Sequence, residues 1–463
     1  MKKNIFAFLF IFFCLVNSSK AQRLSKEQAK ADLKFTYDAL KQIHPSVYRY
    51  TKAEEFDNIY KFLDARITDS VDTADLAEIT NVLLATTRCV HTNMINGLKK
   101  KSNTFFSLNF IIHKNKLYAR GFSSANDTAL YRIISINKIP SIEIVDRMLM
   151  LRSGDGYGQA FSEAFMSRNF NTFYNILYKS PESVVFVIQD KGKEREVKVE
   201  RQKKNSNKYK SFDWEGAIAL DTMAAAKLYK LKNIPSTRVL KIEKFKRKNT
   251  TFYTKIFSDM QRDSVQQLVI DLRQNSGGNI YHAFYLLNKL IDKDIYMYSE
   301  RRKTKVMPYL SNKGKFQYTL GFLLYDVVPN GQRWNDANGM KYYRYSYKTL
   351  NTSNFKPKVF VLTDGVTVSA SSLVAAYLKY YYNAEIIGTE TGGTYTGNNG
   401  RSFVEVMMPN STLKFRVPMH YINYFPGVPN TGKGVAVDYE MSPLLDKKSQ
   451  ELFLQDILLR NVD

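Results

Sequence analysis

The chain of 463 residues is long enough for more than one folded unit, because a single hydrophobic core rarely extends over so many residues. Its hydrophobic content of 44%, with 14% aromatic residues, excludes an intrinsically disordered chain. The formal net charge is +25, and the basic residues are scattered along the sequence. This distribution indicates a basic surface that favours anionic surroundings such as cell-envelope polymers. We expect no nucleic-acid partner.

The first 21 residues have the three parts of a secretory signal peptide. Lys2 and Lys3 precede an apolar run over residues 5–16, and the small-x-small sequence S-K-A stands just before Gln22. The apolar run is shorter than the roughly 20 residues that a spanning helix needs, and no later segment is continuously apolar for that length. The sequence therefore predicts an exported, periplasmic or extracellular protein with no transmembrane segment after cleavage.

Removal of residues 1–21 would leave Cys89 as the only cysteine, so the mature fold cannot depend on an internal disulfide. We expect a packed thiol at Cys89, although a catalytic role is also open. Five histidines are present, no two of them spaced as metal ligands on a helix: His44, His91, His113, His282 and His420. The sequence therefore predicts neither a metal site nor a cofactor.

Residues 22–98 are predicted to form an N-terminal helical domain. Apolar side chains recur there at helical spacing, at Leu33, Tyr37, Leu40 and Ile43. Two capping boxes are expected, at Ser25-x-x-Gln28 and Thr51-x-x-Glu54. Pro45 is expected to end the first helix.

Residues 104–201 change to a pattern of short strands. Alternation predicts strands at residues 106–112, 132–136, 184–188 and 195–199. Residues 133–140, I-I-S-I-N-K-I-P, resemble the I-x-S-I-N-G-x-P turn of PDZ domains, which bind extended peptides at a sheet edge. An insertion over residues 153–180 makes this PDZ-like domain atypical, and a small β-domain without a peptide groove is the alternative.

Residues 211–463 are predicted to form the catalytic domain. Strands at residues 239–242, Leu268, Val359 and Ile386 alternate with helices, and antiparallel strands follow at 403–407 and 413–417. This order predicts an α/β fold with a mixed sheet. Between them, residues 294–352 are rich in aromatic residues and lysine, and we expect either a lid or substrate wall or a plain surface excursion.

Two strand-to-helix turns in this domain contain candidate catalytic groups. Residues 271–278, D-L-R-Q-N-S-G-G, follow a strand, and adjacent glycines there leave backbone N–H groups free to donate. Ser369 lies between the strand near Val359 and a helix expected over residues 371–382. A serine in this position commonly caps a helix, but the same helix end also favours a developing oxyanion.

Together the D-L-R-x-N-x-G-G sequence and the later S-A-S-S resemble the C-terminal processing (tail-specific) serine peptidases, whose second motif reads S-A-S-E. Residues 386–393 and 434–438 resemble two further family segments, I-G-E-x-T-x-G and G-V-E-P-D. The resemblance implies a ClpP/crotonase-like core preceded by a helical domain and a PDZ-like β-domain. It also implies a serine-type endopeptidase with Ser369 as nucleophile and the N–H groups of Gly278 and Ala370 as oxyanion hole.

The general base follows from the branch of the family. Thr394 stands where the Ser-Lys branch has its lysine, whereas residues 89–92, C-V-H-T, resemble the histidine-bearing segment of the branch that includes the tricorn core protease. The resemblance thus implies His91 as base. Imidazole has a reference pKa of about 6.5, so activity is expected to fall as pH drops through about 6 to 7.

Departures from the family pattern leave the third catalytic group open. The glutamate of G-V-E-P-D is absent, so Asp438 and Glu440 are the candidates, and Ser372 replaces the glutamate of S-A-S-E. The sequence is therefore interpreted as an exported peptidase acting on peptide or protein substrates. The alternatives are an inactive peptide-binding homologue and an extracytoplasmic carrier of apolar ligands.

Overall fold

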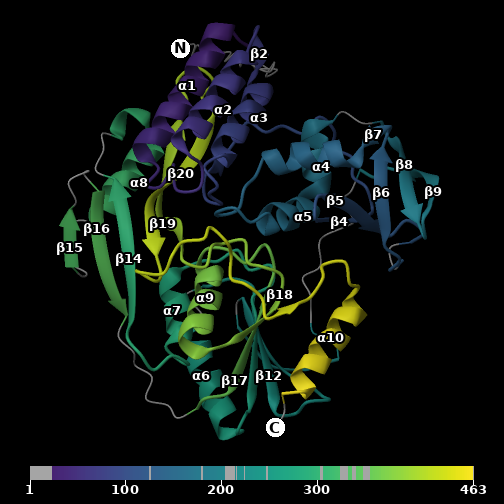
Figure 1. Cartoon of the computed structure of the whole chain (residues 1–463), viewed down its shortest axis with the longest axis vertical. Coiled ribbons are helices and arrows are strands. Elements are labelled where there is room, and N and C mark those ends of the chain that lie inside the picture. The colour runs from purple at the N-terminus through teal and green to yellow at the C-terminus, as the bar shows by residue number, and fades with distance from the viewer. Residues whose placement is uncertain are drawn as a thin grey trace, which may run out of the picture.

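The chain has a mixed α/β fold with several sheets (Figure 1). The computed structural model describes residues 23–124, 127–178, 181–203, 214, 216–223, 225–246, 249–302, 306–323, 332–335, 340–347 and 355–461. The predicted signal peptide, residues 1–21, lies outside the described residues. Within those ranges, no helix has the length and apolar character that crossing a membrane requires.

Three helices form the N-terminal part of the molecule, at the top of Figure 1. Their bounds are α1, Lys26–Ile43, α2, Ala53–Ala65, and α3, Thr73–Ala85, with the short strands β1, Arg23–Leu24, and β2, Val71–Asp72, paired beside them. The apolar positions expected on one face of α1 are all buried: Leu33, Tyr37, Leu40 and Ile43. The 3.6-residue period therefore identified the packed face correctly.

The two predicted capping boxes have different outcomes. Ser25 forms a complete box with Gln28, and α1 ends at Ile43 just before Pro45, as predicted. The box at Thr51 is wrong, because α2 starts after Lys52 and shows no side-chain cap. The Thr51 hydroxyl instead donates to the carbonyl of Thr86 at 2.6 Å, so a tertiary contact has taken the group that a local cap would use.

A six-stranded antiparallel sheet with two helices follows. It consists of β4, Asn109–His113, β5, Lys116–Arg120, β6, Tyr131–Ile136, β7, Ile139–Pro140, β8, Ser183–Asp190, and β9, Lys193–Glu200. The helices are α4, Ser141–Met150, and α5, Ala160–Leu177. Helix α5 occupies most of the segment predicted as an insertion, and it packs with α4 into one core with the sheet.

The largest sheet has seven strands in the order β10-β11-β12-β13-β17-β18-β21. They are β10, Ile218–Met223, β11, Ala226–Lys230, β12, Thr237–Ile242, β13, Gln267–Asp271, β17, Lys358–Thr363, β18, Glu385–Gly388, and β21, Tyr439–Glu440. The pairs from β12 to β21 are parallel, whereas β10, β11 and β12 pair antiparallel. The sheet is therefore mixed, as predicted.

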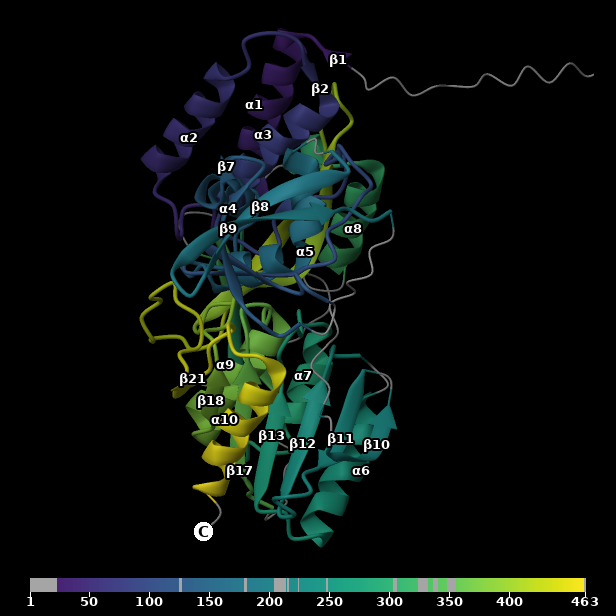
Figure 2. The same cartoon turned by 90° about the vertical axis from the view of Figure 1, so that its right-hand side faces the viewer.

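Alternate residues of this sheet face two different helical layers. Val359 and Val361 pack with α6, Asn249–Arg262, α7, Ile280–Leu287, and α9, Ala370–Tyr382. Phe360 and Leu362 pack with α10, Lys447–Leu459, which crosses the other face (Figure 2). Helices on both faces explain why the central strands are almost continuously apolar.

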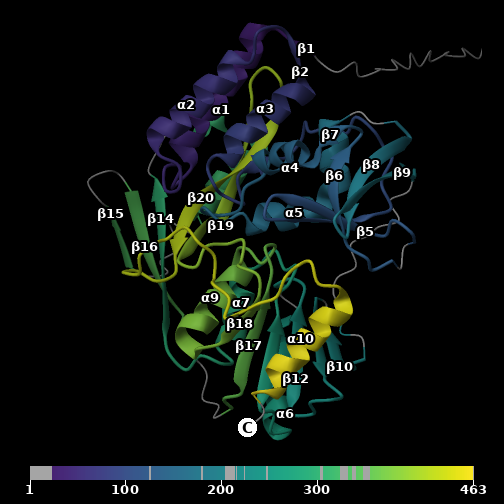
Figure 3. The same ribbon diagram turned by 45° about the vertical axis from the view of Figure 1, so that its right-hand side comes forward.

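A third sheet joins the N-terminal helices to the core. Its strands are β3, Asn93–Met94, β14, Ile295–Arg302, β15, Gln332–Asn335, β16, Met340–Tyr347, β19, Gly397–Met407, and β20, Lys414–Asn423. Strands β19 and β20 pair antiparallel, as predicted, but they lie outside the seven-stranded sheet, below the N-terminal helices (Figure 3). The described part of residues 294–352 supplies β14 to β16 of this sheet, with η1, Met307–Tyr309, and α8, Asn312–Phe322.

Candidate active site

Ser369 lies on the turn that joins β17 to α9, and its backbone is strained. Its φ of 60° and ψ of −128° place a non-glycine residue in a sparsely populated region, which costs on the order of 1–3 kcal/mol. Ser369 stands at the N-cap position of α9 but makes no side-chain cap hydrogen bond. Its hydroxyl, half-buried at the start of a buried helix, is therefore not used as a cap.

The two neighbouring serines are used structurally. The Ser371 hydroxyl donates to the carbonyls of Asn275 and Val368, and the Ser372 hydroxyl donates to the carbonyl of Ser369 at 2.9 Å. Both side chains are fully buried. Of the three serines in S-A-S-S, Ser369 alone keeps a hydroxyl that is not committed to a hydrogen bond within the described residues.

The two glycines of residues 271–278 bring their backbone against this turn. Gly277 has a φ of +99°, and a Cβ there would lie 2.8 Å from Cβ of Ser369 and 3.0 Å from the backbone nitrogen of Ala370. Only glycine allows this approach. Gly278 forms a parallel bridge with Phe245, in which Phe245 bonds to the residues on either side of Gly278. The N–H of Gly278 therefore points away from Phe245.

Neither Gly278 nor Ala370 has a backbone N–H hydrogen bond within the described part of the chain. Because Gly277 touches both Ser369 and Ala370, these two donors lie at the same turn as the serine hydroxyl. Two unpaired N–H groups beside a hydroxyl, at the positive end of a helix, form the arrangement that stabilises an oxyanion.

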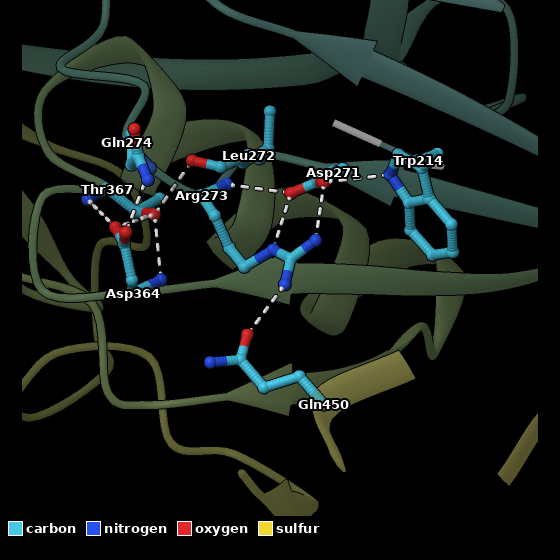
Figure 4. A network of polar contacts seen from close by, with 8 residues as sticks. All are labelled: Trp214, Asp271, Leu272, Arg273, Gln274, Asp364, Thr367 and Gln450. Atoms are coloured by element: carbon cyan, nitrogen blue, oxygen red, sulfur yellow. Dashed lines mark hydrogen bonds and ion pairs between the residues drawn. The ribbon is translucent and has the colours of Figure 1, made fainter. Parts of the chain in front are cut away.

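A buried ion pair fixes the start of the glycine loop (Figure 4). The guanidinium of Arg273 donates twice to the carboxylate of Asp271, at 2.9 and 2.8 Å, and the indole N–H of Trp214 donates to the same carboxylate at 3.1 Å. Burial alone would raise the pKa of Asp271, but Arg273 outweighs it and the pKa is lowered. The first and third residues of D-L-R therefore have a structural role.

Asp364 ties the glycine loop to the serine turn, as Figure 4 also shows. Its carboxylate accepts from the N–H of Gln274 at 3.0 Å and from the N–H of Thr367 at 3.1 Å. The Thr367 hydroxyl in turn donates to the carbonyl of Leu272 at 3.0 Å. The turn before Ser369 and the loop before Gly277 are thus cross-linked from both sides.

His91 lies in the loop between α3 and β3, and it is 8% exposed. Burial, together with the guanidinium groups of Arg416 and Arg152, lowers the pKa of His91 to about 3. Its ring packs against Phe403, with ring centroids 5.2 Å apart. The imidazole is therefore neutral at physiological pH, which is the state that a general base requires.

One contact fixes the chain just after His91, and a second brings the His91 loop against the Ser369 turn. Strand β3, two residues after His91, pairs with β20. Val90, immediately before His91, packs with Phe161 and with Val368, the residue before Ser369. The segments of Ser369 and His91 therefore lie side by side. Among the described residues, no hydrogen bond joins the two side chains.

The sequence analysis missed Asp155, which lies next to His91. An imidazole nitrogen of His91, a carboxylate oxygen of Asp155 and the thiol of Cys89 all lie within 4.8 Å of one another. Burial raises the pKa of Cys89 to about 12, so its thiol stays protonated and unreactive. Metals bind such groups, but the guanidinium groups of Arg152 and Arg416 would repel a cation, and we assign no metal here. The sequence feature that could have pointed to Asp155 is its position among the alternating glycines of G-D-G-Y-G, residues 154–158.

The remaining candidates lie elsewhere. The carboxylate of Asp438 accepts from Nζ of Lys379 and from the N–H of Ile386, each at 2.8 Å. Lys379 is ten residues beyond Ser369, about 15 Å along α9 at the usual helical rise. Glu440 is exposed on β21. Among the described residues, neither carboxylate contacts His91.

Thr394, at the position of the dyad lysine, is fully buried. Its hydroxyl donates to the carbonyl of Gly397 and lies 3.4 Å from the hydroxyl of Tyr50. A neutral side chain that is already hydrogen-bonded offers no base at this position.

Comparisons with known proteins give one family match and several similar folds. Residues 236–441 match the model of peptidase family S41. No curated protein matches the chain. Among solved structures, mature CPAF complexed with lactacystin has a TM-score of 0.66 at 13% identity, over 93% of this chain and 97% of that one. Mature CPAF has a TM-score of 0.64 at 14% identity, over 93% and 96%. Residues 236–441 thus match peptidase family S41, and the chain as a whole has a fold similar to that of CPAF.

Proposed function

We propose that this protein is an exported serine-type endopeptidase in which Ser369 is the nucleophile and His91 the general base. The observation that carries the proposal is the uncommitted hydroxyl of Ser369 beside the unpaired N–H groups of Gly278 and Ala370. A serine used only as a helix cap would need neither the strained backbone nor the two donors.

The proposed reaction follows from these groups. Oγ of Ser369 attacks the carbonyl carbon of a peptide, and its proton passes to His91. The carbonyl oxygen becomes an oxyanion held by the two N–H groups. His91 then gives its proton to the departing amine, which leaves an acyl-enzyme. Water, activated by His91 in the same way, releases the acid product and restores Ser369.

The preference for histidine over lysine as base rests on the buried, uncharged Thr394 and on the packing of Val90 against Val368. Hydrogen bonds at an active site are often long or absent in the free enzyme and tighten when substrate binds. We therefore expect substrate binding to bring the imidazole of His91 onto Oγ of Ser369.

A fluorophosphonate probe tests the nucleophile directly, because it reacts with activated serines only. We expect the label on Ser369, with none on Ser371 or Ser372, whose hydroxyls already donate to carbonyls. Mass spectrometry of the labelled peptide locates the site. Lactacystin, which is bound in the similar CPAF structure, is a second probe for the same turn.

Two results would contradict this assignment. Label on Ser371 in an active protein would identify a different nucleophile. If the protein shows a cooperative thermal unfolding transition, and is therefore folded, but neither takes up the label nor hydrolyses peptides, the inactive peptide-binding homologue would be favoured instead.

Export is a separate part of the proposal and rests on the three-part signal over residues 1–21. We expect the protein in the envelope or extracellular fraction of its host to begin at Gln22. N-terminal sequencing of that fraction measures this directly. Folded protein that retains Met1 in the same fraction would overturn the export proposal and leave the proposed catalytic mechanism unaffected.

A further inference from the structure

The loop over residues 154–156 is held between the two halves of the candidate active site. The N–H of Asp155 donates to the carbonyl of Gly392 at 3.1 Å, on the core side. The N–H of Gly156 donates to the carbonyl of Arg88 at 3.1 Å, on the side of the His91 loop. Gly156 has a φ of +77°, and a Cβ there would overlap the carbonyl of Gly432. Asp155, which stands between Gly154 and Gly156, therefore has a closely fixed backbone position.

The carboxylate of Asp155 is only half satisfied. Oδ1 accepts from the N–H of Val90 at 3.0 Å, whereas Oδ2 is buried with no hydrogen-bond partner among the described residues. In the same part of the structure, Nδ1 of His91 is also buried without a partner. An imidazole nitrogen of His91 and a carboxylate oxygen of Asp155 lie within 4.8 Å of each other, and each residue keeps one buried polar atom without a partner, so a hydrogen bond between the two side chains would satisfy both.

We propose that Asp155 is the positioning residue for His91, with its carboxylate accepting a hydrogen bond from Nδ1 of the imidazole. This inference rests on the proposed function, because it assigns the third group of that same site. The ring of His91 now interacts with the backbone of Asn399, and Nδ1 is the nitrogen without a partner. Nδ1–H held by the carboxylate would leave Nε2 unprotonated, so that Nε2 gives up the Asn399 backbone and takes the proton of Ser369. The carboxylate then stabilises the imidazolium and itself stays ionised.

The charges around the cluster explain why a carboxylate is needed. Arg152 donates to the carbonyl of Val90 at 3.0 Å, and Arg416 donates to the carbonyl of His91 at 3.3 Å. Both guanidinium groups disfavour an imidazolium at His91. A negative charge within 4.8 Å offsets this repulsion when the proton arrives.

The remaining titratable groups that face Asp155 are neutral near pH 7. They are Cys89, Tyr50 and Tyr424, and burial raises the pKa of each. Burial also raises the pKa of Asp155 to about 7, against the opposing effects of the Val90 N–H and of Arg152. Asp155 must be ionised to act, so catalysis is expected to rise with pH through about 7. His91 has a pKa of about 3, so its own titration would not produce a rise of the rate near pH 7, the acid limb of the pH–rate profile.

Asp155→Asn is the decisive variant, because asparagine keeps an acceptor for the N–H of Val90 but cannot ionise. Its amide would donate toward Nδ1 of His91 and favour the tautomer that cannot accept from Ser369. We expect kcat for a peptide substrate to fall by about 10²- to 10⁴-fold with KM little changed, as for loss of an orienting carboxylate. The limb near pH 7 should disappear. Cys89→Ser, which alters the third member of the cluster, should keep both the rate and the limb.

The outcomes separate this inference from the peptidase proposal. If wild type hydrolyses peptides and a folded Asp155→Asn variant matches its kcat and pH profile, the positioning role is wrong and the peptidase proposal stands. If wild type neither hydrolyses peptides nor reacts with a fluorophosphonate, both fail. Should the variant not fold, the wild-type profile still decides: a kcat independent of pH between 5 and 8 would overturn the role of Asp155.

Discussion

Replacement of Ser369 by alanine should lower kcat/KM for peptide hydrolysis by about 10⁴- to 10⁶-fold, because the acyl-enzyme can no longer form. The fold should survive, since the Ser369 hydroxyl makes no cap hydrogen bond. The residual rate would come from the N–H groups of Gly278 and Ala370 and from substrate binding. Initial rates on a fluorogenic peptide, measured beside thermal unfolding of both proteins, provide the comparison.

Ser372→Ala is the matched control for this experiment. Its hydroxyl donates to the carbonyl of Ser369 and lies three residues further along the same helix. Activity close to wild type is expected. If Ser369→Ala retained most of the activity while Ser372→Ala lost it, the nucleophile would have been assigned to the wrong serine.

Replacement of His91 by alanine should lower kcat/KM by about 10³- to 10⁵-fold, because the proton of Ser369 then has no acceptor. Free imidazole added to the assay should restore part of the rate by entering the space left by the side chain. The pKa of about 3 means that His91 stays an unprotonated base throughout the neutral range. An acid limb at pH 6 to 7 caused by the imidazole itself, as the sequence suggested, is therefore no longer expected.

His282→Ala is the control for His91→Ala. His282 lies on α7, four residues after Gly278, and so is close to the glycine loop along the chain. We expect this variant to hydrolyse peptides at nearly the wild-type rate. Loss of activity in His282→Ala together with near-full activity in His91→Ala would reassign the base.

The sequence predicted best what depends on neighbours along the chain. The apolar strand at Val359, the turn at Ser369 and the helix after it follow from local pattern and from the capping preferences of helix ends. The same holds for Ser25, whose box with Gln28 lies within a single turn. At Thr51 the local rule failed, because a tertiary acceptor on Thr86 won the hydroxyl.

The rest of the site depends on contacts that no local pattern encodes. His91 reaches the core through the pairing of β3 with β20 and through the packing of Val90 against Val368. The sequence analysis looked for the third group at Asp438 because of the family motif, whereas Lys379 holds that carboxylate near the far end of α9. Asp155 went unnoticed because its segment was interpreted as an insertion, although two glycines flank it.

The candidate site draws on three separately packed cores, since His91 follows the N-terminal helices, Asp155 precedes α5, and Ser369 belongs to the seven-stranded sheet. Each core has its own free energy of opening, and the catalytic constellation exists only while all three remain docked. A small motion that separates the cores would therefore separate these three residues and abolish activity, even with every core still folded. For the peptidase proposed above, docking of the three cores would thus be a condition for activity that is separate from the folding of each core.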